Sequence, residues 1–261
     1  MINSNIKSII LAAGQGSRLR PLTDKYPKGM VELNGVSLIQ RQIDIIKKND
    51  IDSINIVTGY KFEKINFPNI KTYFNPDYEI TNMVESLYAA RDIFDGENDI
   101  IISYSDIIYE ERVLKSLLSS DDNISIVIDK SWKKLWDLRM DDVLSDVESL
   151  KLDNDMNVLE IGKPVKSLSE IEGQYIGLIK IKKEFARYFF KFYEEERNDN
   201  NRTNEVKNIY MTDYLQLLIN KSIKVKAVPI KNGWLEVDTL SDLDVYKGLI
   251  NSNNISLICD V

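Results

Sequence analysis

The stretch "SIILAAGQGSRLRPLTDKYPKGMVEL", from Ser8 to Leu33, decides the fold that we expect for this chain. It opens with an apolar segment, Ser8 to Ala13, that is typical of a buried strand. Gly14 and Gly16 follow directly, and glycines there let backbone N–H groups approach a phosphate. These two glycines alone are weak evidence, because an ordinary turn gives the same pattern. Neither a third glycine nor a Gly-Lys-Ser/Thr completes a known phosphate motif.

The composition around this stretch is that of a globular protein. The chain has 261 residues, of which 43% are hydrophobic and 29% charged. This length suits one large domain or two intimate halves, and we expect a single domain over residues 1–261. The formal net charge is -7. We therefore do not expect the chain to bind nucleic acid or an anionic membrane through its overall charge. Any site that binds an anion must be a local one.

Histidine is absent and Cys259 is the single cysteine. No disulfide can form within the chain, and Cys/His zinc sites and histidine triads are excluded. An enzyme with this composition must use carboxylates, lysine, metal ions or positioning. The polar start, Met1 to Lys7, does not resemble a secretory signal, and no apolar run approaches the ~20 residues of a membrane span. We expect a cytoplasmic protein.

Strand-like and helix-like segments alternate in the first half. Strands are expected at 8–13, 53–58, 70–74, 99–104 and 124–129, and helices at 38–48, 83–93 and 113–118. This rhythm predicts an α/β fold with a mostly parallel sheet flanked by helices. The second half is more mixed and predicts an antiparallel insertion. Its expected strands are 158–161, 175–181, 224–228 and 234–237, its helices are 184–196, 212–220 and 240–249, and 198–205 is a polar loop.

The whole opening stretch is more specific than its glycines. The pattern LAAG-x-G-x-R-L-x-P-L-T, followed by Pro27-Lys28, resembles the signature of the nucleotidyltransferase superfamily. That superfamily includes sugar-1-phosphate nucleotidylyltransferases and bacterial phosphocholine cytidylyltransferases. The resemblance implies a Rossmann-like (GT-A-like) fold, in which residues 1–129 mainly bind the nucleotide and 130–261 mainly bind the acceptor. It implies nucleotide contacts from Leu11, Ala12, Ala13, Gly14, Gly16, Ser17, Gly59, Tyr60, Asn82 and Ser86.

Arg18 and Lys28 fit the catalytic role that the resemblance implies for them. A nucleoside triphosphate brings several negative charges. Arg18 offers a forked donor that matches phosphate oxygens. Lys28 offers a compact positive charge at the α-phosphate, where the attack takes place. Pro27 fixes the direction from which the chain brings Lys28 to that point. The alternative is that both are solvated loop cations.

Two aspartates follow expected strands, Asp106 after SYS and Asp238 after WLEV. The resemblance implies that they bind magnesium; the alternative is that they are ordinary loop or helix-cap residues. Mg²⁺ prefers one or two carboxylates, with phosphate oxygens and water completing its shell. We expect Asp242 and Asp244, on the following helix, to have only a surface role.

The segment for the base departs from the sugar branch. Sugar enzymes usually carry a Gln-x-x-Pro-x-Gly-Leu-like segment, whereas this chain has NPDYEITNMVESLYAARD. Asn82 followed by Ser86-Leu87 is similar to the phosphocholine cytidylyltransferase branch, where this segment lies by the cytosine. Asn82 and Ser86 also suit the start of a helix, and both interpretations can hold together.

The acceptor segments are rich in charge and aromatic rings. Trp132 and Trp136 stand at helical spacing, and they predict either an aromatic cage for a quaternary ammonium or packing against a buried face. The tract from Lys130 through GQYIGLIKI and NIYMTDYLQ resembles a cytidylyltransferase of Campylobacter-type capsule phosphoramidate synthesis, which uses phosphoglutamine. Lys163 resembles a lysine that faces the acceptor phosphate. The remaining acceptor candidates are Glu172, Tyr210 and Asp213.

The sequence therefore predicts a Mg²⁺-dependent cytidylyltransferase that uses CTP and releases pyrophosphate. The expected acceptor is phosphoglutamine, phosphocholine or 2-aminoethylphosphonate, and the expected role is surface-polysaccharide decoration. A sugar-1-phosphate nucleotidylyltransferase using UTP or dTTP is the first alternative. A GT-A-like glycosyltransferase would require an Asp-x-Asp motif at Asp106, and this chain lacks that motif. A nucleotide-binding regulatory protein is the alternative of another class. The oligomeric state is not predicted.

Overall fold

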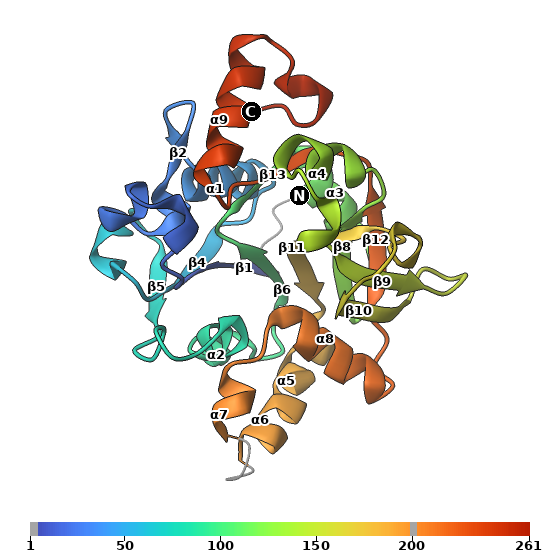
Figure 1. Cartoon of the computed structure of the whole chain (residues 1–261). Coiled ribbons are helices and arrows are strands. Elements are labelled where there is room, and N and C mark those ends of the chain that lie inside the picture. The colour runs from blue at the N-terminus through green and yellow to red at the C-terminus, as the bar shows by residue number, and fades with distance from the viewer. Residues whose placement is uncertain (1–4, 199–202) are drawn as a thin grey trace.

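A computed structural model describes residues 5–198 and 203–261, and its centre is a seven-stranded sheet (Figure 1). The strand order is β12-β8-β11-β6-β1-β4-β5. The strands are β1 (Ile6–Ala12), β4 (Ser53–Thr58), β5 (Lys71–Phe74), β6 (Asp99–Tyr104), β8 (Ile124–Asp129), β11 (Gln174–Ile181) and β12 (Lys226–Ile230). All pairings are parallel except those of β11 with β6 and β8. This confirms the mostly parallel α/β sheet with an antiparallel part in the second half.

Three two-stranded sheets lie outside the main sheet. They pair β2 (Glu32–Leu33) with β3 (Val36–Ser37), β7 (Ile107–Tyr109) with β13 (Trp234–Glu236), and β9 (Glu148–Leu152) with β10 (Val158–Pro164). The β7–β13 pair matters most for function. It brings the chain just after Asp106 beside the chain just before Asp238.

Helices cover both faces of the main sheet (Figure 1). They are α1 (Leu38–Lys48), α2 (Met83–Tyr88), α3 (Glu111–Leu118), α4 (Lys133–Arg139), α5 (Lys183–Phe189), α6 (Lys191–Arg197), α7 (Thr203–Lys207), α8 (Met211–Asn220) and α9 (Leu240–Asn251). Successive side chains of β1 point to opposite faces, as the pleat of a strand requires. Ile10 packs in the core formed with α1, α3, α4 and α9, whereas Ile9 packs in the core formed with α2, α5, α6 and α8.

The predicted elements differ from the observed ones in a few places. The helix expected over 83–93 ends at Tyr88, and a short 3-10 turn covers Arg91–Ile93. The helix expected over 184–196 is two helices, α5 and α6, with Phe190 at the break. The Phe190 ring packs on Tyr88 and Phe94, a contact that no local pattern reveals. Part of the expected polar loop 198–205 lies outside the described residues, and α7 occupies its end.

Strands β7 and β9 are not predicted from the sequence, and the expected strand 224–228 lies two residues later as β12. Within the described ranges, no helix is long and apolar enough to cross a membrane. The carboxyl ends of the parallel strands β1, β4 and β6 meet at one edge of the sheet, which is where open α/β sheets bind their ligands.

Candidate active site

The glycine-rich loop after β1 is shaped around Lys28. Gly16 has φ 69°, in the left-handed region that favours glycine. A Cβ atom added there would lie 2.7 Å from the Cβ of Lys28. The hydroxyl of Thr23 donates a hydrogen bond of 2.9 Å to the Gly16 carbonyl and closes the loop. Gly16 is therefore required by the close approach of the loop to Lys28.

The same loop is also held in place by Gly59 and Tyr60, at the end of β4. The Tyr60 amide donates to the Ala13 carbonyl at 3.0 Å, and the Tyr60 hydroxyl donates to the Thr23 carbonyl at 2.9 Å. A Cβ atom on Gly59 would lie 2.7 Å from that Ala13 oxygen. Their visible role is to hold the loop, and a direct contact with nucleotide stays a prediction.

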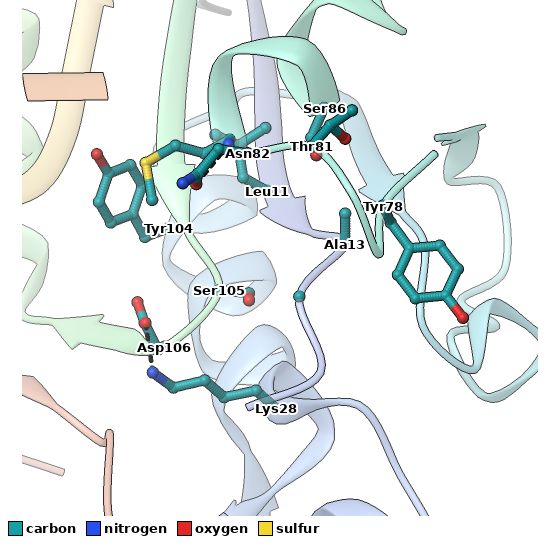
Figure 2. A pocket seen from close by; sticks show the side chains of 12 residues that line it. Leu11, Ala13, Lys28, Tyr78, Thr81, Asn82, Ser86, Tyr104, Ser105 and Asp106 are labelled. Atoms are coloured by element: carbon teal, nitrogen blue, oxygen red, sulfur yellow. Dashed lines mark hydrogen bonds and ion pairs between the residues drawn. The ribbon is translucent and has the colours of Figure 1, made fainter. Parts of the chain in front are cut away.

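Four predicted residues from distant parts of the sequence form one charged cluster. The Lys28 Nζ lies 2.7 Å from Asp106 Oδ2 and 2.5 Å from Asp238 Oδ1. The Arg18 guanidinium lies 2.6 Å from the other Asp238 oxygen, Oδ2. Figure 2 shows Lys28 reaching from its loop to Asp106 beside the cavity described below. The two cations and the two carboxylates that the sequence singles out thus meet at the sheet edge.

The cluster keeps Lys28 charged. Burial by itself would lower the pKa of Lys28, but the charges of Asp106, Asp238 and Glu236 outweigh it and raise that pKa above its ordinary value. Glu236, in β13, has a raised pKa because burial and the nearby carboxylates outweigh the Arg139 charge. The surrounding carboxylates therefore favour the protonated, cationic form of Lys28.

A buried ion pair supports the backbone at Asp238. Arg139 and Asp242 have side chains that are 0% exposed, and their atoms Nε and Oδ1 lie 3.0 Å apart. The Asp242 carboxylate also accepts hydrogen bonds of 2.8 Å from the amides of Asp238 and Thr239. The surface role predicted for Asp242 is wrong, because this carboxylate caps α9 and fixes the chain at Asp238. Asp244 is exposed, as expected.

The Asp106 carboxylate leaves one oxygen free for a cation, whereas both oxygens of Asp238 are paired with Lys28 and Arg18. Asp106 Oδ1 is buried and has no hydrogen-bond partner in the structure. An orphaned carboxylate oxygen of this kind is costly unless a ligand satisfies it. Among the described residues, no group of three or more acidic, cysteine or histidine side chains is arranged to hold a metal. Two carboxylates suffice for Mg²⁺ when phosphate oxygens and water supply the remaining ligands.

A cavity of about 160 Å³ opens beside Lys28 and Asp106 (Figure 2). Five of the predicted nucleotide-binding residues line it, namely Leu11, Ala13, Gly14, Asn82 and Ser86. Ala12 faces the opposite core, and Gly16 and Ser17 lie in the loop beside Lys28. The residues missed from the sequence are Tyr78, Thr81, Met83, Tyr104 and Ser105. Most of them are direct sequence neighbours of Asn82 or Asp106. That adjacency is the feature of the sequence by which they could have been identified.

Asn82 and Ser86 also have the structural role that the sequence allows for them, at the start of a helix. The Asn82 side chain accepts from the Met83 amide at 2.8 Å and caps α2. Ser86 is held by buried Asn75, whose Nδ2 donates to the Ser86 hydroxyl at 3.0 Å and to the Thr81 hydroxyl at 3.1 Å. Asn75 therefore fixes the positions of Ser86 and Thr81, two polar residues that line this cavity.

A second cavity, of about 280 Å³, adjoins the first, and both are lined by Lys28, Met83, Tyr104 and Asp106. Its further lining comes from the second half of the chain. These residues are Trp136, Asp146, Glu148, Gln174, Tyr175, Ile176, Gly177, Tyr210, Met211, Thr212, Trp234, Glu236 and Asp238, and Arg18 joins them from the first loop. The two cavities therefore meet at the charged cluster.

Two of the seven predicted acceptor residues, Trp136 and Tyr210, line this second cavity. Trp132 is buried in the core and packs edge-to-face on Trp136, with ring centroids 5.8 Å apart. Packing therefore accounts for Trp132. Trp136 is 4% exposed and also contributes to the cavity wall, and a contact with a quaternary ammonium stays a prediction.

Lys163 and Asp213 lie elsewhere. Both line a different cavity between β10, α6 and α8, and Lys163 Nζ pairs with Glu160 at 2.5 Å. Asp213 accepts from the Tyr210 amide at 3.2 Å and caps α8. Neither residue is among those that line the second cavity, and the acceptor role of both stays a prediction.

The acceptor role of Glu172 and Lys130 also stays a prediction, and the structure shows other contacts for both. The Glu172 carboxylate accepts from the Leu152 amide at 2.6 Å and ties β9 to the start of β11. Lys130 is exposed just beyond β8, and its amide donates to the Ile230 carbonyl at 2.9 Å. Neither residue is among those that line the second cavity.

Comparisons with known proteins agree with this geometry. Residues 8–157 match the family of MobA-like NTP transferase domains. The chain is 40% identical over 250 residues to a CTP:phosphoglutamine cytidylyltransferase of Campylobacter jejuni, a match that covers 92% of this chain and 98% of that protein. It is 33% identical over 119 residues to a choline-phosphate cytidylyltransferase of Streptococcus pneumoniae, covering 44% of this chain and 51% of that protein.

The fold has a close counterpart among solved structures. The CTP:phosphocholine cytidylyltransferase from Streptococcus pneumoniae superposes with a TM-score of 0.72 at 21% identity, over 94% of this chain and 99% of that one. This likeness shows the shared fold, and the sequence matches show the family. The chain belongs to the family of MobA-like NTP transferase domains and is a nucleotidyltransferase related to the cytidylyltransferases.

Proposed function

We propose that this protein transfers CMP from CTP to a small phosphorylated amine or amino acid and releases pyrophosphate, with Mg²⁺ as cofactor. The observation that supports the proposal best is the cluster in which Lys28 lies between Asp106 and Asp238, with Arg18 on Asp238. It stands between a cavity from the first half of the chain and a cavity lined mostly by the second half. We propose residues 1–129 as the nucleotide half and 130–261 as the acceptor half of one domain.

The proposed reaction needs no general base. An oxygen of the acceptor phosphate is already anionic, attacks the α-phosphorus of CTP in line, and the bond to pyrophosphate breaks. Catalysis is then positioning and charge neutralisation. Arg18 and Lys28 supply fixed positive charge where negative charge develops. Asp238 orients both cations, and Asp106 orients Lys28.

When bound, magnesium would neutralise charge on the phosphates. Asp106 and Asp238 would hold it, and the unpartnered Asp106 Oδ1 offers a free ligand atom. The Gly14–Arg18 loop lies beside Lys28, and its backbone amides would contact the phosphates. The cavity lined by Asn82 and Ser86 would take the cytosine, with Asn75 holding Ser86 in place.

The acceptor proposal draws on the relatives. Phosphoglutamine is the first candidate because the relative from Campylobacter jejuni is matched over nearly its whole length. Phosphocholine and 2-aminoethylphosphonate come next. A role in surface-polysaccharide decoration and a cytoplasmic location stay predictions.

The deciding experiment measures pyrophosphate release with each nucleoside triphosphate, Mg²⁺ and a panel of acceptors that includes glucose-1-phosphate. We expect CTP with a phosphorylated amine or amino acid to give the highest kcat/KM. Equal kcat/KM for UTP and CTP would contradict the assignment of the base cavity. A preference for glucose-1-phosphate would move the protein to the sugar branch.

A further inference from the structure

A fully buried amide side chain, that of Gln42, lies among the apolar residues that α1 packs into the core. It is 0% exposed, and the other buried residues of α1 are all apolar, namely Leu38, Ile39, Ile43 and Ile46. A buried amide group is costly unless its hydrogen bonds are made. The partners of Gln42 should therefore explain why a polar residue occupies an apolar face of this helix.

Those partners belong to the segment that carries Asp106. The Gln42 Nε2 donates to the Tyr104 carbonyl at 2.8 Å and to the Ile107 carbonyl at 2.6 Å. Its Oε1 accepts from the Ser103 hydroxyl at 2.6 Å, which fixes the end of the amide that donates. These three bonds join residues that are 61 to 65 positions apart in the sequence.

The two carbonyls lie on either side of Asp106. Strand β6 ends at Tyr104 and β7 begins at Ile107, so only Ser105 and Asp106 form the turn between them. Figure 2 shows Tyr104, Ser105 and Asp106 following one another along this turn beside the first cavity. One amide group thus joins both ends of the turn, and both of its donor hydrogens are used there.

The Asp106 carboxylate depends on this backbone for its position. Its Oδ2 pairs with Lys28 Nζ, whereas its Oδ1 has no hydrogen-bond partner. Two further bonds hold the turn through its backbone. The Ser105 amide donates to the Leu11 carbonyl at 3.1 Å, and the Val237 amide donates to the Asp106 carbonyl at 2.9 Å. Because an aspartate side chain is short, a shift of the turn moves the carboxylate with it.

Helix α1 also supports the lysine of this ion pair. The next residue in the chain, Gly29, is packed so closely that a Cβ on it would lie 2.6 Å from Ile39 Cδ1 and 2.8 Å from Ser105 Cβ. Ile39 and Gln42 are three positions apart and lie on one face of the helix. That face therefore supports the backbone of both partners of the ion pair.

We infer that Gln42 is a positioning residue for the proposed reaction, because its amide holds the turn between β6 and β7 so that the Asp106 carboxylate meets Lys28. The inference rests on the proposed function and deepens it, because it assigns a role in the charged cluster to a residue that lines neither of its two cavities. A misplacement of about 1 Å can cost about 10²-fold in rate, so the position of this turn bears directly on kcat.

The first test replaces the amide with an apolar side chain of similar length. Gln42→Met should lower kcat by roughly 10- to 100-fold and leave KM for CTP and for the acceptor within about threefold of wild type. Pyrophosphate release at saturating Mg²⁺ measures both quantities. Thermal unfolding of the same samples measures the accompanying loss of stability.

Asn55→Leu is the matched control for the loss of a buried amide. Asn55 is 6% exposed, and its Nδ2 donates to the Ser8 carbonyl at 3.1 Å, near the amino end of β1. This variant should also unfold at a lower temperature than wild type. Its kcat, measured at a temperature where it is folded, should equal that of wild type.

Ser103→Ala is a milder variant of the same network. It keeps the Gln42 amide and removes only the hydroxyl that orients it. We expect kcat to fall by about three- to tenfold, in line with the loss of one neutral hydrogen bond.

A double-mutant cycle shows whether Gln42 acts through Asp106. In an Asp106→Asn background the carboxylate is already lost, so Gln42→Met should lower kcat further by less than about threefold. Damage that is only structural would persist in full in that background. A crystal structure of Gln42→Met gives a measurement that does not depend on turnover, and it should show the Asp106 carboxylate farther from Lys28 Nζ than in wild type.

The outcomes separate the inference from the proposed function. A wild-type protein that releases no pyrophosphate with CTP and any acceptor overturns the proposed function, and the inference falls with it. With an active wild type, the inference alone is overturned by a wild-type kcat in Gln42→Met, by an equal loss in Asn55→Leu, or by an undiminished loss in the Asp106→Asn background. An unmoved Asp106 carboxylate in the crystal structure of Gln42→Met does the same. If Gln42→Met does not fold, an unchanged kcat in Ser103→Ala overturns the inference.

Discussion

The Lys28 ammonium lies 2.5 Å from a carboxylate oxygen of Asp238, although 210 positions separate the two residues in the sequence. Lys28 belongs to the loop after the first strand, and Asp238 follows β13 near the end of the chain. The β7–β13 pairing closes this distance, because it places the segment before Asp238 beside the segment after Asp106. The charged cluster therefore depends on the fold of the whole chain.

Removing the Lys28 charge should nearly abolish turnover. We expect Lys28→Ala to lower kcat by about 10²–10³-fold, the typical effect of losing one preorganised electrostatic group. Steady-state pyrophosphate release measures this. Lys25→Ala, at an exposed position of the same loop, is the control and should retain wild-type activity. Activity of Lys28→Ala within a few-fold of wild type would show that the catalytic assignment is wrong.

The metal proposal predicts a shift in magnesium dependence. Asp106→Asn and Asp238→Asn should each raise the Mg²⁺ concentration needed for half-maximal activity by at least about tenfold and should lower kcat. Titrating activity with Mg²⁺ checks this. Asp244→Asn, at an exposed position of α9, should leave the titration curve unchanged. An unshifted curve for both site variants would exclude these carboxylates as ligands.

Gly16 should not tolerate a side chain. In Gly16→Ala the new Cβ would stand 2.7 Å from the Lys28 Cβ, at a residue whose φ is positive. We expect the loop to shift, Lys28 to move from the carboxylates, and kcat to fall by one to two orders of magnitude, about 1.4 kcal/mol of barrier for each factor of ten. Gly248→Ala, in α9 with open space at its Cβ, should keep full activity. A Gly16→Ala variant as active as wild type would refute the close-approach argument.

The buried pair behind the site should govern stability. Asp242→Ala removes the partner of fully buried Arg139 together with the cap on α9, and we expect a loss of about 3–5 kcal/mol in the free energy of unfolding. Urea denaturation monitored by fluorescence gives this value. Asp244→Ala, two positions later and exposed, should change it by less than about 0.5 kcal/mol. Equal stability of the two variants would show that Asp242 does not support the site.

Much of the fold could be predicted because local patterns encode it. Helix α1 and the strands β4, β6 and β8 have the predicted bounds, since each is a periodic or apolar run with clear ends. The break between α5 and α6 could not be predicted, because it depends on Phe190 packing against Tyr88 from another part of the chain. Strand β9 is equally hidden, since its pairing partner and not its own pattern makes it a strand.

The sequence by itself determined the glycine-rich loop, its two cations and the strand-end carboxylates Asp106 and Asp238. These features are short and local, and their chemistry requires particular residue types at close spacing. Only the tertiary structure decided which side chains line the cavity proposed for the acceptor. Lys163 and Glu172 have charges suited to an acceptor, but neither is among the residues that line that cavity, and both make local contacts. Asp146 and Glu148 reach the cavity because β9 and β11 come together there, and contacts between distant segments leave no periodic mark in the sequence.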